Sequence, residues 1–152
     1  MPIDRLILPE RVARSLWEHA SECSPAEACG FLAGRDGQVE QAIRILNQAA
    51  ESGRFSMDPA DQVRAHYRIL DEGLDLMAVY HSHPAGPVRP SATDERELGG
   101  MGLVQVIVHG TQGGWELRAF CWSRGSFQSL PVGIDGDGGL ISIADHPGEE
   151  ER

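Results

Sequence analysis

The sequence predicts a single domain of mixed α/β class, and three observations support this fold class. The chain has 152 residues, about the length of one domain, and contains no internal repeat. Stretches with apolar residues at helical spacing alternate with short apolar stretches typical of strands. Apolar residues make up 41% of the chain and charged residues 24%, as in ordinary globular proteins. We therefore expect one sheet with helices packed on it.

The first part of the chain predicts a helix followed by a β-hairpin. Apolar residues recur at helical spacing over residues 9–22. Residues 29–35 and 38–46 are each typical of a strand, and the Asp36-Gly37 pair between them is a turn signal. We therefore expect these two strands to pair with each other.

A second helix is predicted to begin after Asp58. Aspartate is a favoured N-cap residue, and Pro59 occupies the first helical position, where proline is tolerated. Gly73 should end the helix, because glycine adopts the backbone conformation that closes helices. We expect the core-facing stripe of this helix to consist of Val63, Tyr67 and Leu70.

The second half of the chain predicts mainly strands. Residues 74–83 contain a continuous apolar run, which is typical of a strand inside a sheet. A loop should span 84–90, a short helix 91–98, and further strands 103–108, 115–122 and 127–132. We expect the domain to occupy residues 1–132 and the acidic, Gly-rich tail 133–152 to be flexible.

Composition argues against several classes of function. The formal net charge is −10, whereas nucleic-acid binding needs clustered Lys and Arg. No apolar run approaches the roughly 18 residues of a membrane span, and no secretory signal is evident at the N-terminus. Three cysteines without C-x-x-C spacing argue against a disulfide framework or a thiolate metal site. We expect a cytoplasmic protein and leave its oligomeric state open.

His81 and His83 are the first indication of chemistry. Side chains two apart on a strand point to the same face, so both imidazoles can reach one metal ion. Pro84 ends the strand, and the following loop can bring Asp94 over the same ion. Two histidines and one carboxylate leave a fourth position for water, as in catalytic zinc sites. An alternative interpretation is local, with Ser91 and Asp94 forming an ordinary capping box.

These residues resemble a known family. His81-Ser-His-Pro, seven residues from Pro84 to Pro90, and Ser91-x-x-Asp94 resemble the JAMM motif of the MPN+ or JAB-domain zinc metalloproteases. The upstream segment Glu27-Ala-Cys-Gly-Phe-Leu resembles the Glu-x-Cys-Gly-x-Leu segment of that family. The similarity extends over about residues 5 to 130 and is closest to the short bacterial type.

The resemblance implies a role for each matched residue. His81, His83 and Asp94 would bind one Zn²⁺ per chain, with water as the fourth ligand. Glu27 would act as the general base, and Ser91 would donate a hydrogen bond to the developing oxyanion. Spacing alone does not identify Glu27. The family also implies a cytidine-deaminase-like fold, in which helices flank a curved mixed sheet.

The remaining histidines are less informative. His109 ends a predicted strand, where it could contact the ligands or the substrate, or simply face a turn. His19, His66 and His146 are predicted to lie on the surface or in the tail.

The resemblance also implies a class of substrate. Family members cut amide bonds at or after the C-terminus of ubiquitin-like proteins. Because this chain is short, we expect a zinc metallopeptidase or isopeptidase acting after the Gly-Gly end of a ubiquitin-like sulfur carrier, or on a related peptide. Two alternatives remain: a cell-wall or phage-tail type peptidase component, and a non-catalytic MPN scaffold.

Overall fold

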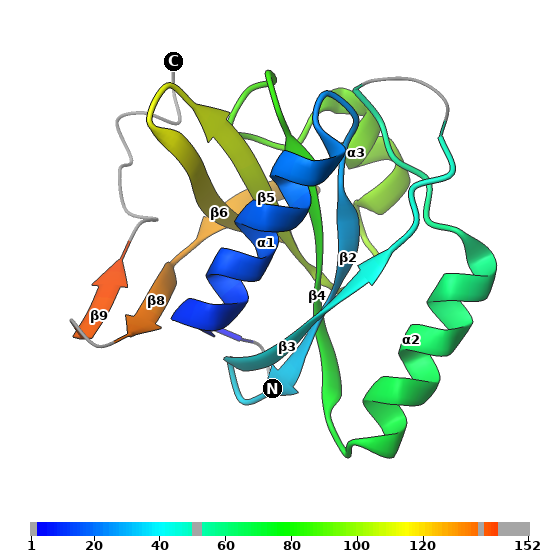
Figure 1. Cartoon of the computed structure of the whole chain (residues 1–152), viewed down its shortest axis with the longest axis vertical. Coiled ribbons are helices and arrows are strands. Elements are labelled where there is room, and N and C mark those ends of the chain that lie inside the picture. The colour runs from blue at the N-terminus through cyan, green and yellow to red at the C-terminus, as the bar shows by residue number, and fades with distance from the viewer. Residues whose placement is uncertain (1–2, 50–52, 137–138, 143–152) are drawn as a thin grey trace.

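The computed structural model describes residues 3–49, 53–136 and 139–142. Within these ranges, nine strands form one mixed sheet in the order β7-β6-β5-β4-β2-β3-β1-β8-β9, flanked by three helices (Figure 1). The elements are β1 (Leu6–Pro9), α1 (Glu10–Cys23), β2 (Cys29–Arg35), β3 (Gln38–Ile45), α2 (Pro59–Asp71), β4 (Asp75–His83), α3 (Ala92–Leu98), β5 (Val104–Thr111), β6 (Gly114–Ser123), β7 (Ser126–Leu130), β8 (Val132–Gly136) and β9 (Gly139–Ser142). The predicted mixed sheet with flanking helices is confirmed. No helix in the described ranges has the length and apolar character needed to cross a membrane.

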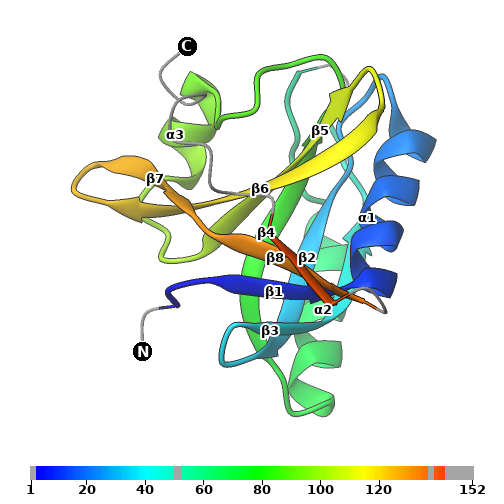
Figure 2. The same cartoon turned by 90° about the vertical axis from the view of Figure 1, so that its left-hand side faces the viewer.

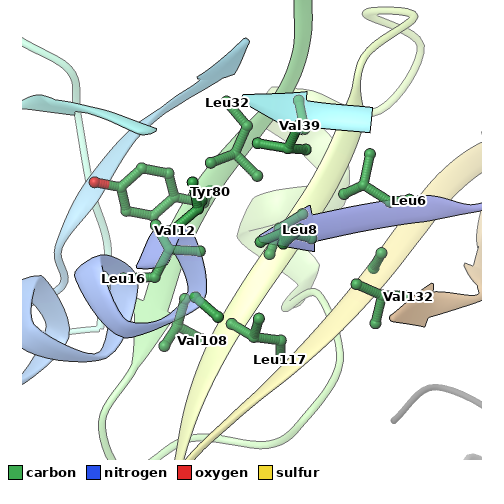
Figure 3. Close-up of a cluster of buried hydrophobic side chains, with 14 of the residues drawn as sticks. Leu6, Leu8, Val12, Leu16, Leu32, Val39, Tyr80, Val108, Leu117 and Val132 are labelled. Carbon is green, nitrogen blue, oxygen red and sulfur yellow. The ribbon is translucent and has the colours of Figure 1, made fainter. Parts of the chain in front are cut away.

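The largest core lies between α1 and the inner face of the sheet. Val12 and Leu16 of α1 are buried against side chains from distant strands, including Leu8, Leu117 and Val132 (Figure 3). Leu117 belongs to β6 near one end of the strand order, whereas Leu8 and Val132 belong to the neighbouring strands β1 and β8 near the other end. The sheet therefore curls around α1, and Figure 2 shows β1 and β8 crossing in front of β2 and β4, with α1 at the right.

β4 is an interior strand whose side chains alternate between the two faces of the sheet. It pairs antiparallel with β2 and parallel with β5. Ala78 and Tyr80 pack in the core around α1, whereas Val79 packs in a second core beside α2. This period of two places His81 and His83 on the same face as Val79, on the side of the sheet away from α1.

α2 packs through a different stripe from the predicted one. Ala65 and Ile69 are buried, whereas Val63, Tyr67 and Leu70 are 54%, 64% and 72% exposed. The predicted core-facing stripe is therefore wrong. Both stripes have helical spacing, and the small side chain of Ala65 allows the helix to lie close to the sheet. The three larger apolar residues form an exposed apolar face on the outside of α2.

The chain after Gly133 differs from the expected flexible tail. Leu8 of β1 pairs with Ile134 in a parallel ladder between β1 and β8, and β9 pairs antiparallel with β8. Residues 133–136 and 139–142 are therefore part of the sheet, and the predicted strand 127–132 is divided at Pro131 into β7 and β8. β1 has four residues and no clear local signal, so its pairing depends on the rest of the sheet. Residues 143–152, including His146, lie outside the described ranges.

His19 is buried, which contradicts the expectation of a surface position. It is 7% exposed, and its Nδ1 lies 2.7 Å from the hydroxyl oxygen of Tyr80. Burial, aided by Arg44 and opposed by Glu22, lowers the pKa of His19 to about 4. Gly30 makes room for Tyr80, because a Cβ at this glycine would lie 2.4 Å from Cε2 of the ring.

We expect the depressed pKa of His19 to make folding stability depend on pH. The folded state holds His19 neutral down to about pH 4, whereas in the unfolded chain this histidine is protonated below about 6.5. The contribution of His19 to the free energy of unfolding is therefore fully present above about pH 6.5. It decreases by about 2 to 3 kcal/mol as the pH falls toward 4. Denaturant unfolding at pH 7.5 and 4.5 measures this loss. His19→Gln should lose less stability over the same interval, and an equal loss in both proteins would contradict the assignment.

Candidate metal centre

His81 and His83 lie at the carboxyl end of β4, inside the sheet. His81 is opposite Cys29 on β2 and Ile107 on β5, and His83 is opposite His109 on β5. His81 is 0% exposed and His83 is 5% exposed. Their Nε2 atoms are 3.0 Å apart. The two imidazoles therefore converge on one point.

Asp94 reaches the two histidines from the first turn of α3. A capping box begins this helix: the Asp94 N–H donates to Ser91 Oγ at 3.0 Å, and the Ser91 N–H donates to Asp94 Oδ2 at 2.8 Å. The same Oδ2 lies 3.1 Å from His81 Nε2 and 3.3 Å from His83 Nε2. The capping box is therefore present and also orients the Asp94 carboxylate toward the histidines, so the local interpretation is compatible with a metal site.

The loop before α3 orients His83. The Nδ1 atom of His83 donates to the carbonyl oxygen of Pro87 at 2.8 Å, so the neutral ring carries its lone pair on Nε2. His81 is held differently. Its ring stacks on Phe55, with ring centroids 4.5 Å apart and planes inclined by 22°. Both rings therefore present Nε2 to the same point.

The three donor atoms fit a zinc ion. Nε2 of His81, Nε2 of His83 and Oδ2 of Asp94 are separated by 3.0, 3.1 and 3.3 Å. Ligands at about 2.0–2.1 Å from a tetrahedral zinc lie roughly 3.3 Å from one another. Burial opposes ionisation of Asp94, but its contacts with both histidines and the hydrogen bond from the Ser91 N–H hold its pKa well below the usual range. Two imidazoles and one carboxylate form the donor set of an open zinc site.

Glu27 lies beside these donors, just before β2. It is 4% exposed, and one of its carboxylate oxygens lies within 4.8 Å of a ring nitrogen of both His81 and His83. Its Oε1 atom is buried and has no hydrogen-bond partner among the described residues. Burial raises the pKa of Glu27 to about 7, with His83 opposing and Asp94 adding to the shift. Since Asp94 Oδ2 lies within hydrogen-bond distance of both histidines, Asp94 is better placed than Glu27 to be a third ligand.

Ser91 keeps a proton that it can donate. Its hydroxyl oxygen accepts the Asp94 N–H, and a serine hydroxyl that accepts one bond still has its own hydrogen available. His109 is opposite His83 on β5. Its Nε2 is 3.4 Å from Glu116 Oε2 on β6, and Glu116 is not one of the site residues. A contact of His109 with the ligands or the substrate stays a prediction.

Three further residues shape the site. Ser82 lies between the two histidines on β4 and points the other way, and its Oγ accepts the N–H of Ala28, the residue after Glu27. Phe55 covers the ring of His81, and Asn47 bonds the carbonyl of Glu27. The strand alternation indicated the direction of Ser82. The sequence carries no comparable signal for Phe55 or Asn47, because both reach the site through a long connection.

Comparison with known proteins identifies the family of this chain. Residues 9–123 match the family model described as prokaryotic homologs of the JAB domain. A probable TtuB-protein conjugate cleaving protease of Thermus thermophilus is 33% identical over 128 residues, covering 84% of this chain and 82% of that protein. A desampylase of Haloferax volcanii is 31% identical over 142 residues, covering 89% of this chain and all of the relative.

The fold is also similar to a solved structure. The solution structure of protein DSY2949 from Desulfitobacterium hafniense superposes with a TM-score of 0.79 and 28% identity, covering 87% of this chain and 94% of that one. The family match extends over most of the chain and includes all the residues of the candidate metal centre. This chain therefore belongs to the prokaryotic JAB-domain family.

Proposed function

We propose that this chain is a zinc-dependent peptidase that hydrolyses the amide bond after the C-terminal Gly-Gly of a ubiquitin-like sulfur-carrier protein. The observation that carries the proposal is the convergence of His81, His83, Asp94 and Glu27 in one buried cluster. The Thermus relative, named for cleaving a protein conjugate, supports a hydrolase of this kind. Retention of all the ligand side chains favours an enzyme over a non-catalytic scaffold.

His81, His83 and Asp94 are the residues that would hold the zinc ion. When bound there, zinc polarises the scissile carbonyl and makes a water molecule more acidic. The hydrogen bonds from Ser91 to Asp94 and from His83 to Pro87 keep the ligand atoms in place before binding.

Glu27 and Ser91 carry out the proton transfer and the stabilisation of charge. Glu27 accepts a proton from the attacking water and passes it to the leaving amine, and a pKa of about 7 suits both steps at neutral pH. Ser91 donates its hydroxyl hydrogen to the carbonyl oxygen as negative charge develops there.

The burial of the donors favours glycine at the scissile bond. His81, His83, Asp94 and Glu27 are each no more than 7% exposed, so only a thin segment of chain can approach them. Glycine has no side chain, and its backbone can come close to other groups. An extended Gly-Gly tail meets this requirement and can run along the end of the sheet.

The exposed apolar face of α2 is suited to hold the folded part of such a substrate. Val63, Tyr67 and Leu70 lie along one side of α2, and Leu46, 61% exposed, lies near the start of the helix. The chain just before α2 carries Phe55, which stacks on His81, so the chain that leads into this helix lies beside the site. Contiguous exposed apolar residues of this kind are typical of protein-binding surfaces.

The first prediction of this proposal concerns Glu27. Wild-type protein should remove an extension from a ubiquitin-like carrier lengthened beyond its Gly-Gly end, as measured by intact-mass spectrometry. Glu27→Gln should bind zinc as wild type does but lose roughly 10² to 10⁴-fold in rate, because the substituted amide cannot accept the proton. Removal of the metal with a chelator should abolish cleavage, and zinc should restore it. Cleavage of cell-wall peptides instead of the carrier would favour the alternative peptidase, and full activity in Glu27→Gln would exclude Glu27 as the base.

The second prediction concerns pH. Since Glu27 must be ionised to accept a proton, kcat/KM should fall as the pH decreases through its pKa. Burial raises that pKa to about 7, and a cation bound nearby lowers it. We expect the acid limb of the profile to have its midpoint between about pH 5 and 7, with bound zinc measured at every pH. A profile that stays flat to pH 5 while zinc remains bound would contradict the assigned role.

The third prediction concerns the apolar face of α2. Tyr67→Ala should raise KM for a folded carrier substrate about tenfold with little change in kcat, because removing a large aromatic contact weakens docking. A short peptide that contains the same Gly-Gly bond should be cleaved equally well by both proteins. Arg68→Ala, a change at an exposed charged position on the same helix, serves as the control. An unchanged KM in Tyr67→Ala would show that the carrier docks elsewhere.

A further inference from the structure

Asn47 makes four hydrogen bonds, called here the hub, where the connection between β3 and α2 begins. Its Nδ2 donates to the carbonyl oxygen of Glu27 at 2.9 Å and to that of Arg54 at 3.3 Å. Its Oδ1 accepts the N–H of Ala49 and the N–H of Ser56, both at 2.9 Å. All four hydrogen-bonding positions of the side-chain amide are therefore used.

The arrangement fixes the orientation of the Asn47 amide. Its nitrogen faces two carbonyl oxygens and its oxygen faces two N–H groups, so a flipped amide would oppose like groups at all four contacts. Asparagine is the side chain of this length that supplies two donors and two acceptors together. The residue is therefore matched to its position in a way that alanine or aspartate is not.

The hub joins the two segments that flank the metal centre. On one side it holds the backbone of Glu27, whose neighbour Ala28 is also bonded to Ser82 on β4. On the other side it holds Ser56, the residue after Phe55, whose ring stacks on His81. One side chain thus ties the proposed general base and the aromatic cover of a proposed ligand to the same point.

We propose that Asn47 is a positioning residue that fixes Glu27, and Phe55 over His81, in the geometry the reaction needs. This inference rests on the proposed function and extends it to a residue that touches neither zinc nor substrate. Glu27 precedes β2, so its backbone lies outside the regular ladder that begins at Cys29. The Asn47 bond to its carbonyl and two bonds between Ala28 and Ser82, one of them between backbones, hold the segment just outside that ladder. Misplacement of a reacting group by about 1 Å can cost roughly 10²-fold in rate.

Two substitutions at Asn47 distinguish the hydrogen bonds that its amide donates from those that it accepts. Asn47→Asp has nearly the same shape and keeps the acceptor for Ala49 and Ser56, but it opposes a carboxylate oxygen to the Glu27 carbonyl. Asn47→Ala removes all four bonds. Gln48→Ala is the matched control, because Gln48 is exposed and its side chain bonds Ser56 without reaching Glu27.

The test measures kcat and KM on the carrier substrate, zinc content, thermal stability, and amide hydrogen exchange over residues 24–30. Both Asn47 variants should lose about 10- to 100-fold in kcat, with KM changed less than about threefold and zinc content as in wild type. Exchange over residues 24–30 should be faster in both variants, and Gln48→Ala should behave as wild type. A loss of kcat matched by equal losses of zinc and folded protein would overturn the proposal, as would unchanged kcat and exchange.

The same measurements distinguish a failure of the proposed function from a failure of the proposed role of Asn47. If wild-type protein cleaves no carrier, the proposed function fails, and zinc binding and hydrogen exchange then decide the role of Asn47 without a substrate. Faster exchange over residues 24–30 in the Asn47 variants, with unchanged zinc content, would support the positioning role. Unchanged exchange would overturn that role.

Discussion

The alternation of side chains along β4 is the constraint on which the rest of the site depends. The strand is buried on both faces, so Tyr80 fills the core around α1 while His81 and His83 point to the opposite side. Pairing with β2 and β5 on either side fixes the register. A slip of one residue would turn both imidazoles into the apolar core. The packing of the core and the convergence of the histidines would both be lost. The same packing thus specifies the fold and the position of the two histidines.

The cluster around these histidines shows how local and long-range structure combine in one centre. The capping box of α3 satisfies the helix terminus and also aims Asp94 Oδ2 at the two Nε2 atoms. Burying two imidazoles and two carboxylates together is unfavourable without a compensating charge, since each loses its hydration. A bound cation would supply that charge, and metal binding would then be coupled to folding. Glu27, with a buried oxygen left unpaired among the described residues, fits a group that transfers protons.

Much of the candidate site was predictable because its signals are local. His81 and His83 are two residues apart on a strand, and Ser91 and Asp94 occupy fixed places in a capping box, so their directions follow from the periodicity of each element. Glu27 has no such signal. It was identified by resemblance to a family, and its closeness to the histidines follows only from the pairing of β2 with β4.

By itself, the sequence determined the mixed α/β class, the hairpin turn, the helix caps and the two-residue spacing of the histidines, because each depends on neighbours within a few positions. The tertiary structure alone decided which stripe of α2 is buried, since Val63 and Ala65 both belong to plausible apolar faces. It also decided the pairing of β1 with β8, the burial of His19 and the contact of Asn47 with Glu27. These features depend on contacts between segments far apart in the chain, and local propensity carries no information about which distant segment will supply the partner.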